Sequence, residues 1–117
     1  MFKDIIAKIM GNKPPTEKIN MESISFKMQI QDIFKIQNVG VVLTGVVAAG
    51  SVTVGKSVYI ATNDGTIIHQ DVVGFLESMN GNADLMAVGD DIGIGFKNKQ
   101  VAHYAHRGMF LVVGETL

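Results

Sequence analysis

The sequence lacks cysteine and tryptophan altogether, and it has only two prolines among 117 residues. Without cysteine, disulfides, thiolate metal ligands and a cysteine nucleophile are all excluded. Small secreted domains often depend on disulfides, so we expect a reducing, cytoplasmic location. The chain also lacks an uninterrupted apolar run of about 18 residues, the length that a membrane-crossing helix needs. We therefore expect no membrane span.

A basic surplus is missing as well, because the formal net charge is −1. Dedicated nucleic-acid-binding proteins usually carry excess lysine and arginine. We therefore expect weak, salt-dependent RNA binding at most, and only through a local patch. What the chain does have is 47% hydrophobic and 18% charged residues, a balance typical of one globular domain at this length.

The chain divides into a short helical segment, a linker and a β-rich domain. Apolar residues spaced at i, i+3, i+4 and i+7 predict an amphipathic helix over residues 1–11: Phe2, Ile5, Ile6 and Ile9. Residues 12–23 are predicted to be a linker, and residues 24–117 to be the folded domain. Such a short helix needs a docking surface, either this domain or a second copy of the chain.

From Ile24 onward the pattern changes to strands. Apolar and polar residues alternate over 24–31, and the run Val39–Val47 is apolar on both faces apart from Thr44. Asp64-Gly65 predicts a hairpin, and Gly74 predicts a bend in a strand. About six short strands separated by glycines favour an all-β fold, a closed antiparallel barrel of Greek-key-like type.

Five segments resemble the barrel domain (domain 2) that follows the GTPase domain in elongation factor Tu and related translational GTPases. They are DIFKI at 32–36, GVVLTGVVAAG at 40–50, VGKSVYI at 54–60, AVGDDIGI at 87–94 and RGM at 107–109. The resemblance implies a six-stranded barrel that does no chemistry. In elongation factor Tu this domain packs against the GTPase domain, and part of its surface holds the aminoacylated end of tRNA.

The resemblance assigns the apolar wall of the family's pocket to Ile36 and Val42. It places an acidic residue of that pocket near Leu76. The polar groups that the family uses nearby are replaced here by Val39 and by Ala48–Ala49. Base recognition depends on placed hydrogen bonds, so we do not expect binding of an aminoacylated tRNA end.

A second candidate site is a local phosphate or RNA patch in the segment 97–107. Its residues are Lys97, Lys99, His103, Tyr104 and Arg107. An ordinary polar connection between strands is the alternative. His103 and His106 also suggest a zinc site, which would need His69, Asp90 or Asp91 as further ligands. Nothing in the spacing brings these residues together, so we expect no metal and no cofactor.

We therefore predict a non-catalytic binding module that docks on a protein or ribonucleoprotein partner related to translation. No Gly-x-x-x-x-Gly-Lys-Ser/Thr loop occurs in the sequence, so we expect neither nucleotide binding nor GTPase activity from this chain. The alternative is a structural or assembly protein. In that case the segment 1–11 and the strand Val39–Val47 would form a homodimer or larger homo-oligomer.

Overall fold

The computed structural model describes residues 17–78, 81–82, 85–87, 89 and 91–117. The helix predicted over 1–11 lies outside these residues. The described part is all-β apart from one short helix, as predicted. Its elements are β1 (Ile19–Gln29), β2 (Asp32–Ile36), β3 (Gly40–Thr53), β4 (Ser57–Ala61), β5 (Ile67–Val72), β6 (Phe75–Ser78), β7 (Gly81–Asn82), β8 (Leu85–Ala87), β9 (Asp91–Phe96), α1 (Val101–Tyr104) and β10 (Phe110–Thr116).

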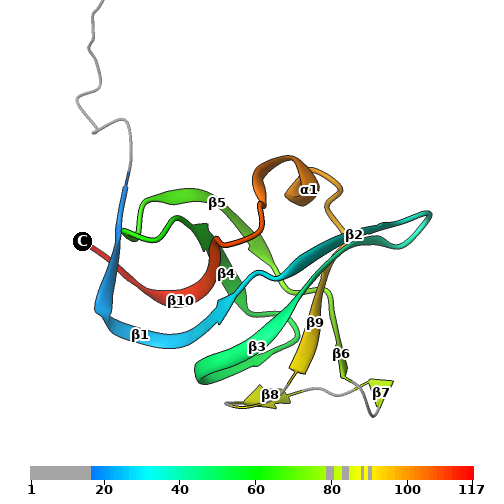
Figure 1. The fold of residues 1–117 in the computed structure, drawn as a ribbon, viewed down its shortest axis with the longest axis horizontal. Helices are drawn as coiled ribbons and strands as arrows, with labels where there is room; N and C mark the ends of the chain where they lie inside the picture. The colour runs from blue at the N-terminus through cyan, green and yellow to red at the C-terminus, as the bar shows by residue number, and fades with distance from the viewer. Residues whose placement is uncertain (1–16, 79–80, 83–84, 88, 90) are drawn as a thin grey trace, which may run out of the picture.

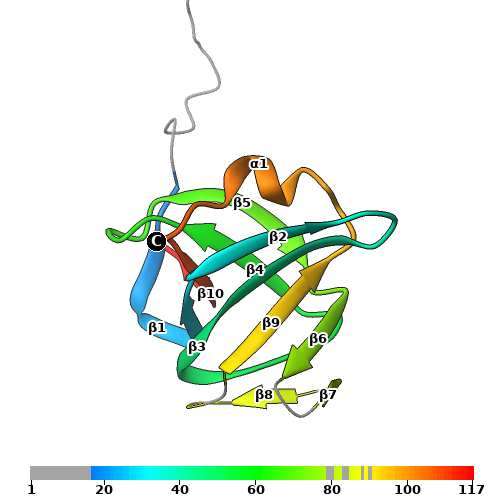
Figure 2. The ribbon, with the colours of Figure 1, turned by 45° about the vertical axis from the view of Figure 1, so that its right-hand side comes forward.

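All strand pairs are antiparallel and belong to one curled sheet (Figures 1 and 2). The hydrogen-bonded order is β5-β4-β10-β1-β3-β9-β6-β7, and β2 and β8 each pair with β3. This order starts at β5 and ends at β7 without returning. The prediction of a closed six-stranded barrel was therefore wrong, since the described residues form a sheet of ten strands that is an open half-barrel.

The break in the sheet lies between β5, at one end of the strand order, and β6, next to the other end. Between them, the Val73 amide donates to the Lys56 carbonyl at 2.9 Å, and the Gly74 amide donates to the Gly95 carbonyl at 2.7 Å. Residues 73 and 74 thus connect the two ends of the sheet and form hydrogen bonds to both, but β5 and β6 do not pair with each other. Gly74 was predicted to mark a bulge or corner within one strand, but it lies in a break between two strands, since β5 ends at Val72 and β6 begins at Phe75.

The predicted linker over 12–23 also needs correction, because β1 begins at Ile19. Ile19 is 1% exposed, packs in a small cluster with Ala61 and Val112, and donates its amide to the Gly65 carbonyl at 2.8 Å. This part of β1 was not predicted, because Ile19 lies between the polar residues Lys18 and Asn20. Burial of one isoleucine and pairing with β10 are what order it.

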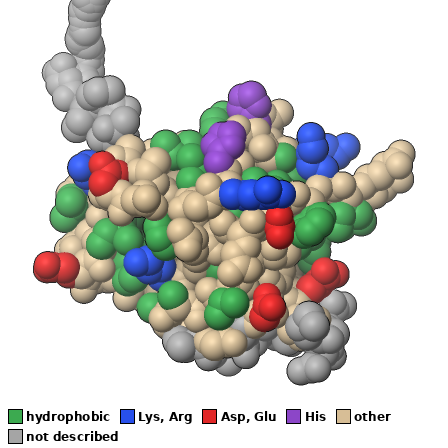
Figure 3. All heavy atoms as spheres, viewed as in Figure 1, with side chains coloured by type: hydrophobic (Ala, Val, Ile, Leu, Met, Phe, Trp, Pro, Cys, Tyr) green, Lys and Arg blue, Asp and Glu red, His purple; other side chains and the backbone are tan. Residues whose placement is uncertain are grey.

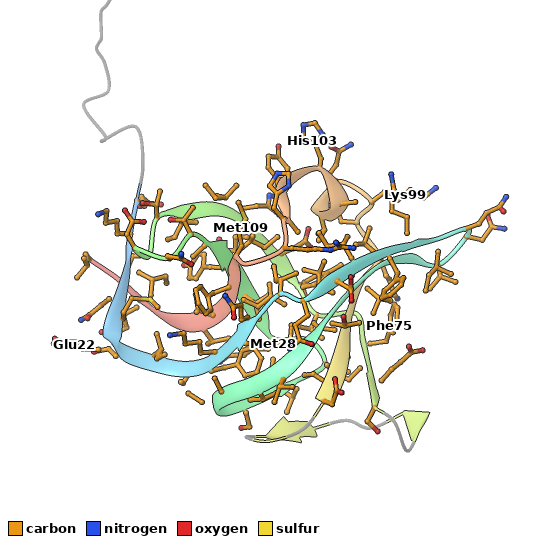
Figure 4. The ribbon with its side chains drawn as sticks, in the orientation of Figure 1. Glu22, Met28, Phe75, Lys99, His103 and Met109 are labelled. Atoms are coloured by element: carbon orange, nitrogen blue, oxygen red, sulfur yellow. The ribbon has the colours of Figure 1, made fainter. Side chains whose placement is uncertain are left out.

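The core lies inside the curled sheet and takes its side chains from alternate strand positions. On β9, Ile92, Ile94 and Phe96 are buried in the core cluster. On β1, Phe26 and Met28 are fully buried, and Figure 4 shows Met28 inside the sheet. Each such side chain contributes about 1.5–3 kcal/mol to folding when it leaves water.

Close approach of strands explains one glycine in particular. Gly50 has φ of +69°, and a Cβ there would overlap the carbonyl oxygen of Ser25 on β1. Only glycine tolerates both conditions easily. Strand β3 pairs with β1, β2, β8 and β9 along its length. Glycine at position 50 allows β3 to approach β1 closely at this point.

The hairpin predicted at Asp64-Gly65 is present between β4 and β5. In its connection only Gly65 has a positive φ, and the Asp64 carboxylate accepts hydrogen bonds from Thr62 and Thr66. The Thr62 and Thr66 bonds hold the pKa of Asp64 well below its usual range. Elsewhere in the described ranges, the one helix, α1, has four residues, and no helix is long and apolar enough to cross a membrane.

Candidate functional site

A cavity of about 330 Å³ opens on the outer face of the sheet where β2, β3, β9 and β6 run side by side (Figure 2). We call this cavity the outer groove. Strands β2 and β3 supply one side, and β6 and β9 supply the other. Its lining residues are Phe34, Ile36, Val42, Thr44, Glu77, Ser78, Asp91, Ile92 and Gly93.

Glycine on β9 gives the outer groove its depth. The register places Gly93 between Thr44 on β3 and Glu77 on β6. A Cβ at Gly93 would stand 2.8 Å from Cγ1 of Val42, so a side chain there would crowd the groove floor. At Gly95, by contrast, the ring of Phe75 already occupies the space where a side chain would be. The groove is therefore open over Gly93 and covered over Gly95.

The β2–β3 side of the outer groove is apolar and exposed. The two strands project as a hairpin beyond the rest of the sheet (Figure 1), with its turn at Asn38 in the left-handed conformation, φ +64°. Phe34 is 52% exposed and Ile36 is 40% exposed, while Val42 beside them is nearly buried. Neighbouring large apolar side chains left in water are typical of an interaction site.

The opposite side of the outer groove is acidic. Glu77 and Asp91 are both exposed and both line the cavity. Within the described ranges, neither carboxylate forms a side-chain hydrogen bond or an ion pair. The nearby Asp32 differs, because Arg107 Nη2 donates to its Oδ1 at 2.9 Å. The groove therefore combines an apolar wall with two carboxylates that have no cation beside them in that part of the chain.

Two of the three pocket residues predicted from the resemblance come together here. Ile36 and Val42 line the same cavity, on paired strands. Leu76 does not join them, because it is 2% exposed and belongs to the core. The next residue, Glu77, points into the groove, as alternation along a strand requires. Of these two neighbours, Glu77 lines the groove and Leu76 lies in the core.

The residues of the predicted phosphate or RNA patch take part in different contacts instead of forming one site. Arg107 is paired with Asp32, whereas Lys99 lines a separate cavity of about 280 Å³ together with Lys35. Figure 4 places Lys99 just before α1 and His103 on α1. Lysine and arginine side chains stand at separate points on the face drawn in Figure 3. This face holds no concentrated basic patch.

Tyr104 and His103 belong to an aromatic cluster between α1 and β5. The Tyr104 ring stacks on His69 with centroids 4.4 Å apart and an angle of 8°, and it meets His103 edge-on at 5.4 Å. One face of Tyr104 is therefore already occupied by His69. The Tyr104 ring, predicted to stack on a base, therefore packs against His69 within the fold.

Asp71 anchors the same cluster. Its Oδ2 lies 3.1 Å from His69 Nε2 and accepts a 2.7 Å hydrogen bond from Asn98. Burial raises the pKa of Asp71, but hydrogen bonds from the Val72 amide, His69 and Asn98 outweigh it, so the pKa is lowered. His69 is thus held by Asp71 and Tyr104. No group of three or more histidine, aspartate or glutamate side chains suited to a metal occurs among the described residues.

Sequence reasoning missed Phe34, Glu77, Asp91 and Gly93 as groove residues. The available signal was the alternation Ile-Gly-Ile-Gly over 92–95, which buries isoleucine on one face and leaves the other face without side chains. The lining groups offer apolar contact, two hydroxyl groups and two carboxylates, an arrangement suited to holding a partner group. No protein-family model matches the chain.

Proposed function

We propose that this chain is a non-catalytic binding module, related in fold to domain 2 of elongation factor Tu, that docks on a protein or ribonucleoprotein partner through the outer groove. The observation that carries the proposal is the meeting of Ile36 and Val42 in one exposed cavity. These are the two positions that the sequence resemblance assigns to the pocket wall of the family.

The proposal assigns the chain no reaction of its own. Phe34 and Ile36 are 52% and 40% exposed, so they leave apolar surface in water where they line the outer groove. Burial of such a surface by a partner is favourable by about 25 cal/mol for each Å² removed from water. Because the sequence contains no phosphate-binding loop, GTP binding and hydrolysis are not part of the proposed role.

The outer groove differs from the pocket that the resemblance implies. Val39 and Ala48–Ala49 stand where the family carries polar groups, and the sheet is open. A ligand that needs those polar groups would leave its own hydrogen-bonding edge unsatisfied, at about 1–3 kcal/mol for each buried group. We therefore propose a partner other than an aminoacylated tRNA end.

The test is capture of partners from the native cell by the full chain. The groove variant is Phe34→Ala with Ile36→Ala. Its matched control is Val54→Ala with Val72→Ala, which removes two other apolar side chains that are 45% and 50% exposed outside the groove. We expect a specific partner that the groove variant fails to retain and the control retains. Nuclease treatment before capture separates a ribonucleoprotein from a protein partner.

Equal capture by wild type, groove variant and control would contradict the proposal. The assembly alternative has less support, because most of the apolar strand Val39–Val47 is already used inside the fold. Only Val39 and Val46 are exposed, at 46% and 41%, among its large apolar residues. Sedimentation of the chain with and without residues 1–15 tests this alternative, and we expect monomers in both cases.

A further inference from the structure

The outer groove carries charge as well as apolar surface, and this charge restricts the chemistry of a partner. We infer that the groove takes an arginine side chain from a protein partner, with the guanidinium group between Glu77 and Asp91 and the aliphatic stem against Phe34 and Ile36. The inference rests on the proposed function and deepens it by naming the group that is bound.

The carboxylates provide the first step. Glu77 and Asp91 line the same cavity, and in the described part of the chain neither is paired with a cation. A partner that covered them with neutral or anionic groups would remove their hydration without replacing it, which is unfavourable. A cation placed there offsets this loss and forms charge-assisted hydrogen bonds.

The surrounding cations do not already fill this role. Arg107 is held by Asp32, and Lys35 lines the separate cavity with Lys99. Lys35 alternates with Phe34 and Ile36 along β2, and only the latter two of these three line the groove. Among the described residues, no cation therefore neutralises Glu77 or Asp91 before a partner binds.

Arginine fits the groove better than lysine does. Its planar guanidinium has five donors and can bridge two carboxylates, whereas an ammonium group is a compact point charge. The exposed ring of Phe34 offers an apolar face on which the aliphatic stem can lie. The methylene stem can cover Ile36 and Val42, as long charged side chains commonly do. A cavity of about 330 Å³ accommodates one such side chain.

A nucleic acid fits the same groove less well. Its phosphates would approach Glu77 and Asp91, and this repulsion opposes binding. The ring acceptors of a base would find, among the described lining side chains, only the hydroxyl groups of Thr44 and Ser78 as hydrogen-bond donors. Binding of a nucleotide is therefore the competing outcome in the test.

The experiment is a titration of the isotope-labelled full chain, followed by amide chemical shifts at constant ionic strength. The probes are N-acetyl-arginine amide, the neutral N-acetyl-citrulline amide of nearly the same shape, and adenosine monophosphate. We expect arginine to shift the amides of Thr44, Glu77 and Gly93 in a saturable manner. Citrulline should bind at least about tenfold more weakly, because the charge-assisted hydrogen bonds are lost.

Two substitutions and a matched control complete the design. Glu77→Gln with Asp91→Asn should weaken arginine binding by about tenfold or more. Glu115→Gln, which neutralises an exposed carboxylate on β10 outside the groove, should leave binding within twofold. The dispersion of the same spectra reports whether each variant is folded. All three positions are exposed, so the substitutions remove no buried contact.

Equal binding of arginine and citrulline would overturn the inference, and so would unchanged binding in the Glu77→Gln, Asp91→Asn variant. Stronger groove shifts with adenosine monophosphate than with arginine would also overturn it. Different results would contradict the proposed binding module and the inferred recognition of arginine. If the carboxylate variant still captures the partner but the Phe34→Ala, Ile36→Ala variant does not, the binding module stands and arginine recognition falls. If every groove variant captures the partner, the proposed function falls, whatever the titration shows.

Discussion

Two regions of the sheet differ in how they are covered: the inner side of β5, which also faces the core, and the outer side of β2. On β5, His69 and Asp71 lie beneath α1 and its preceding loop, through the Tyr104 ring and the Asn98 amide. On β2, Phe34 and Ile36 remain in water beside a cavity. Side chains from α1 and the loop before it thus cover β5, whereas the outer side of β2 is left in water. A partner would bury more apolar surface on the outer side of β2 than on β5.

The difference follows from local sequence. After β9 the chain forms α1 from residues that include an aromatic ring, and α1 contacts both β5 and β2. On β9 itself, glycine alternates with isoleucine, so the outer surface has no side chain over Gly93. Ring stacking covers the first face, and the lack of side chains opens the second.

The largest expected effect contrasts an aromatic residue inside the sheet with one outside it. Phe96 is fully buried, so Phe96→Ala should lower the free energy of unfolding by about 3–5 kcal/mol. Phe34 is 52% exposed, and Phe34→Ala should change the free energy of unfolding by less than about 1 kcal/mol. Urea unfolding of both variants measures the difference. Similar losses in the two variants would show that Phe34 is part of the core.

The two glycines of β9 provide a finer contrast. Gly95→Ala must displace the Phe75 ring, and we expect a loss of about 1–3 kcal/mol in the free energy of unfolding. In Gly93→Ala the new Cβ comes closest to Cγ1 of Val42, at 2.8 Å, so this variant should lose less in the free energy of unfolding while reducing the groove volume. Thermal and urea unfolding of the pair tests this order, and the reverse order would contradict the account of where the groove is open.

The covered face can be tested through the coupling of His69 and Tyr104. Their stacked rings are 4.4 Å apart, so a double-mutant cycle with His69→Ala and Tyr104→Ala should give about 0.5–1.5 kcal/mol of coupling. The readout is urea unfolding. A matched cycle between Tyr104 and the distant Phe34 should give no coupling. Additive losses at His69 and Tyr104 would mean that stacking does not cover β5.

The smallest expected effect is a pH dependence at the same covered face. The pKa of Asp71 is lowered in the folded state from its ordinary value of 3.8. Its stabilising contribution is therefore fully present above the unfolded-state pKa and is lost as the pH falls through the folded-state pKa. Stability measured from pH 6 downward should decline less steeply below about pH 4 in Asp71→Asn than in wild type. Identical acid profiles would exclude this role of Asp71.

Much of the strand pattern was predictable from the sequence, because alternation and glycine punctuation act locally. The β4–β5 hairpin is an example. Closure of the sheet was not predictable, because it depends on which strands meet over a long sequence separation. The start of β1 at Ile19 was missed for the same reason, since its partners, Gly65 and Thr116, are far along the chain.

The candidate site was predictable only in part. Ile36 and Val42 were found through resemblance, and the structure places both in the outer groove. Which residues of β6 face inward was not evident from the sequence, and the structure buries Leu76 and exposes Glu77. The separation of Lys99 from Arg107 depends on three-dimensional pairing with Asp32, which no local pattern reveals.

The central claim is that the open face, and not the covered one, receives the partner. The most direct measurement is amide hydrogen exchange of the full chain, alone and with the partner recovered by capture. We predict added protection over 32–36 and 91–96, with exchange over 67–72 unchanged. Added protection confined to 67–72 and 101–104, with none along β2 and β9, would contradict the claim.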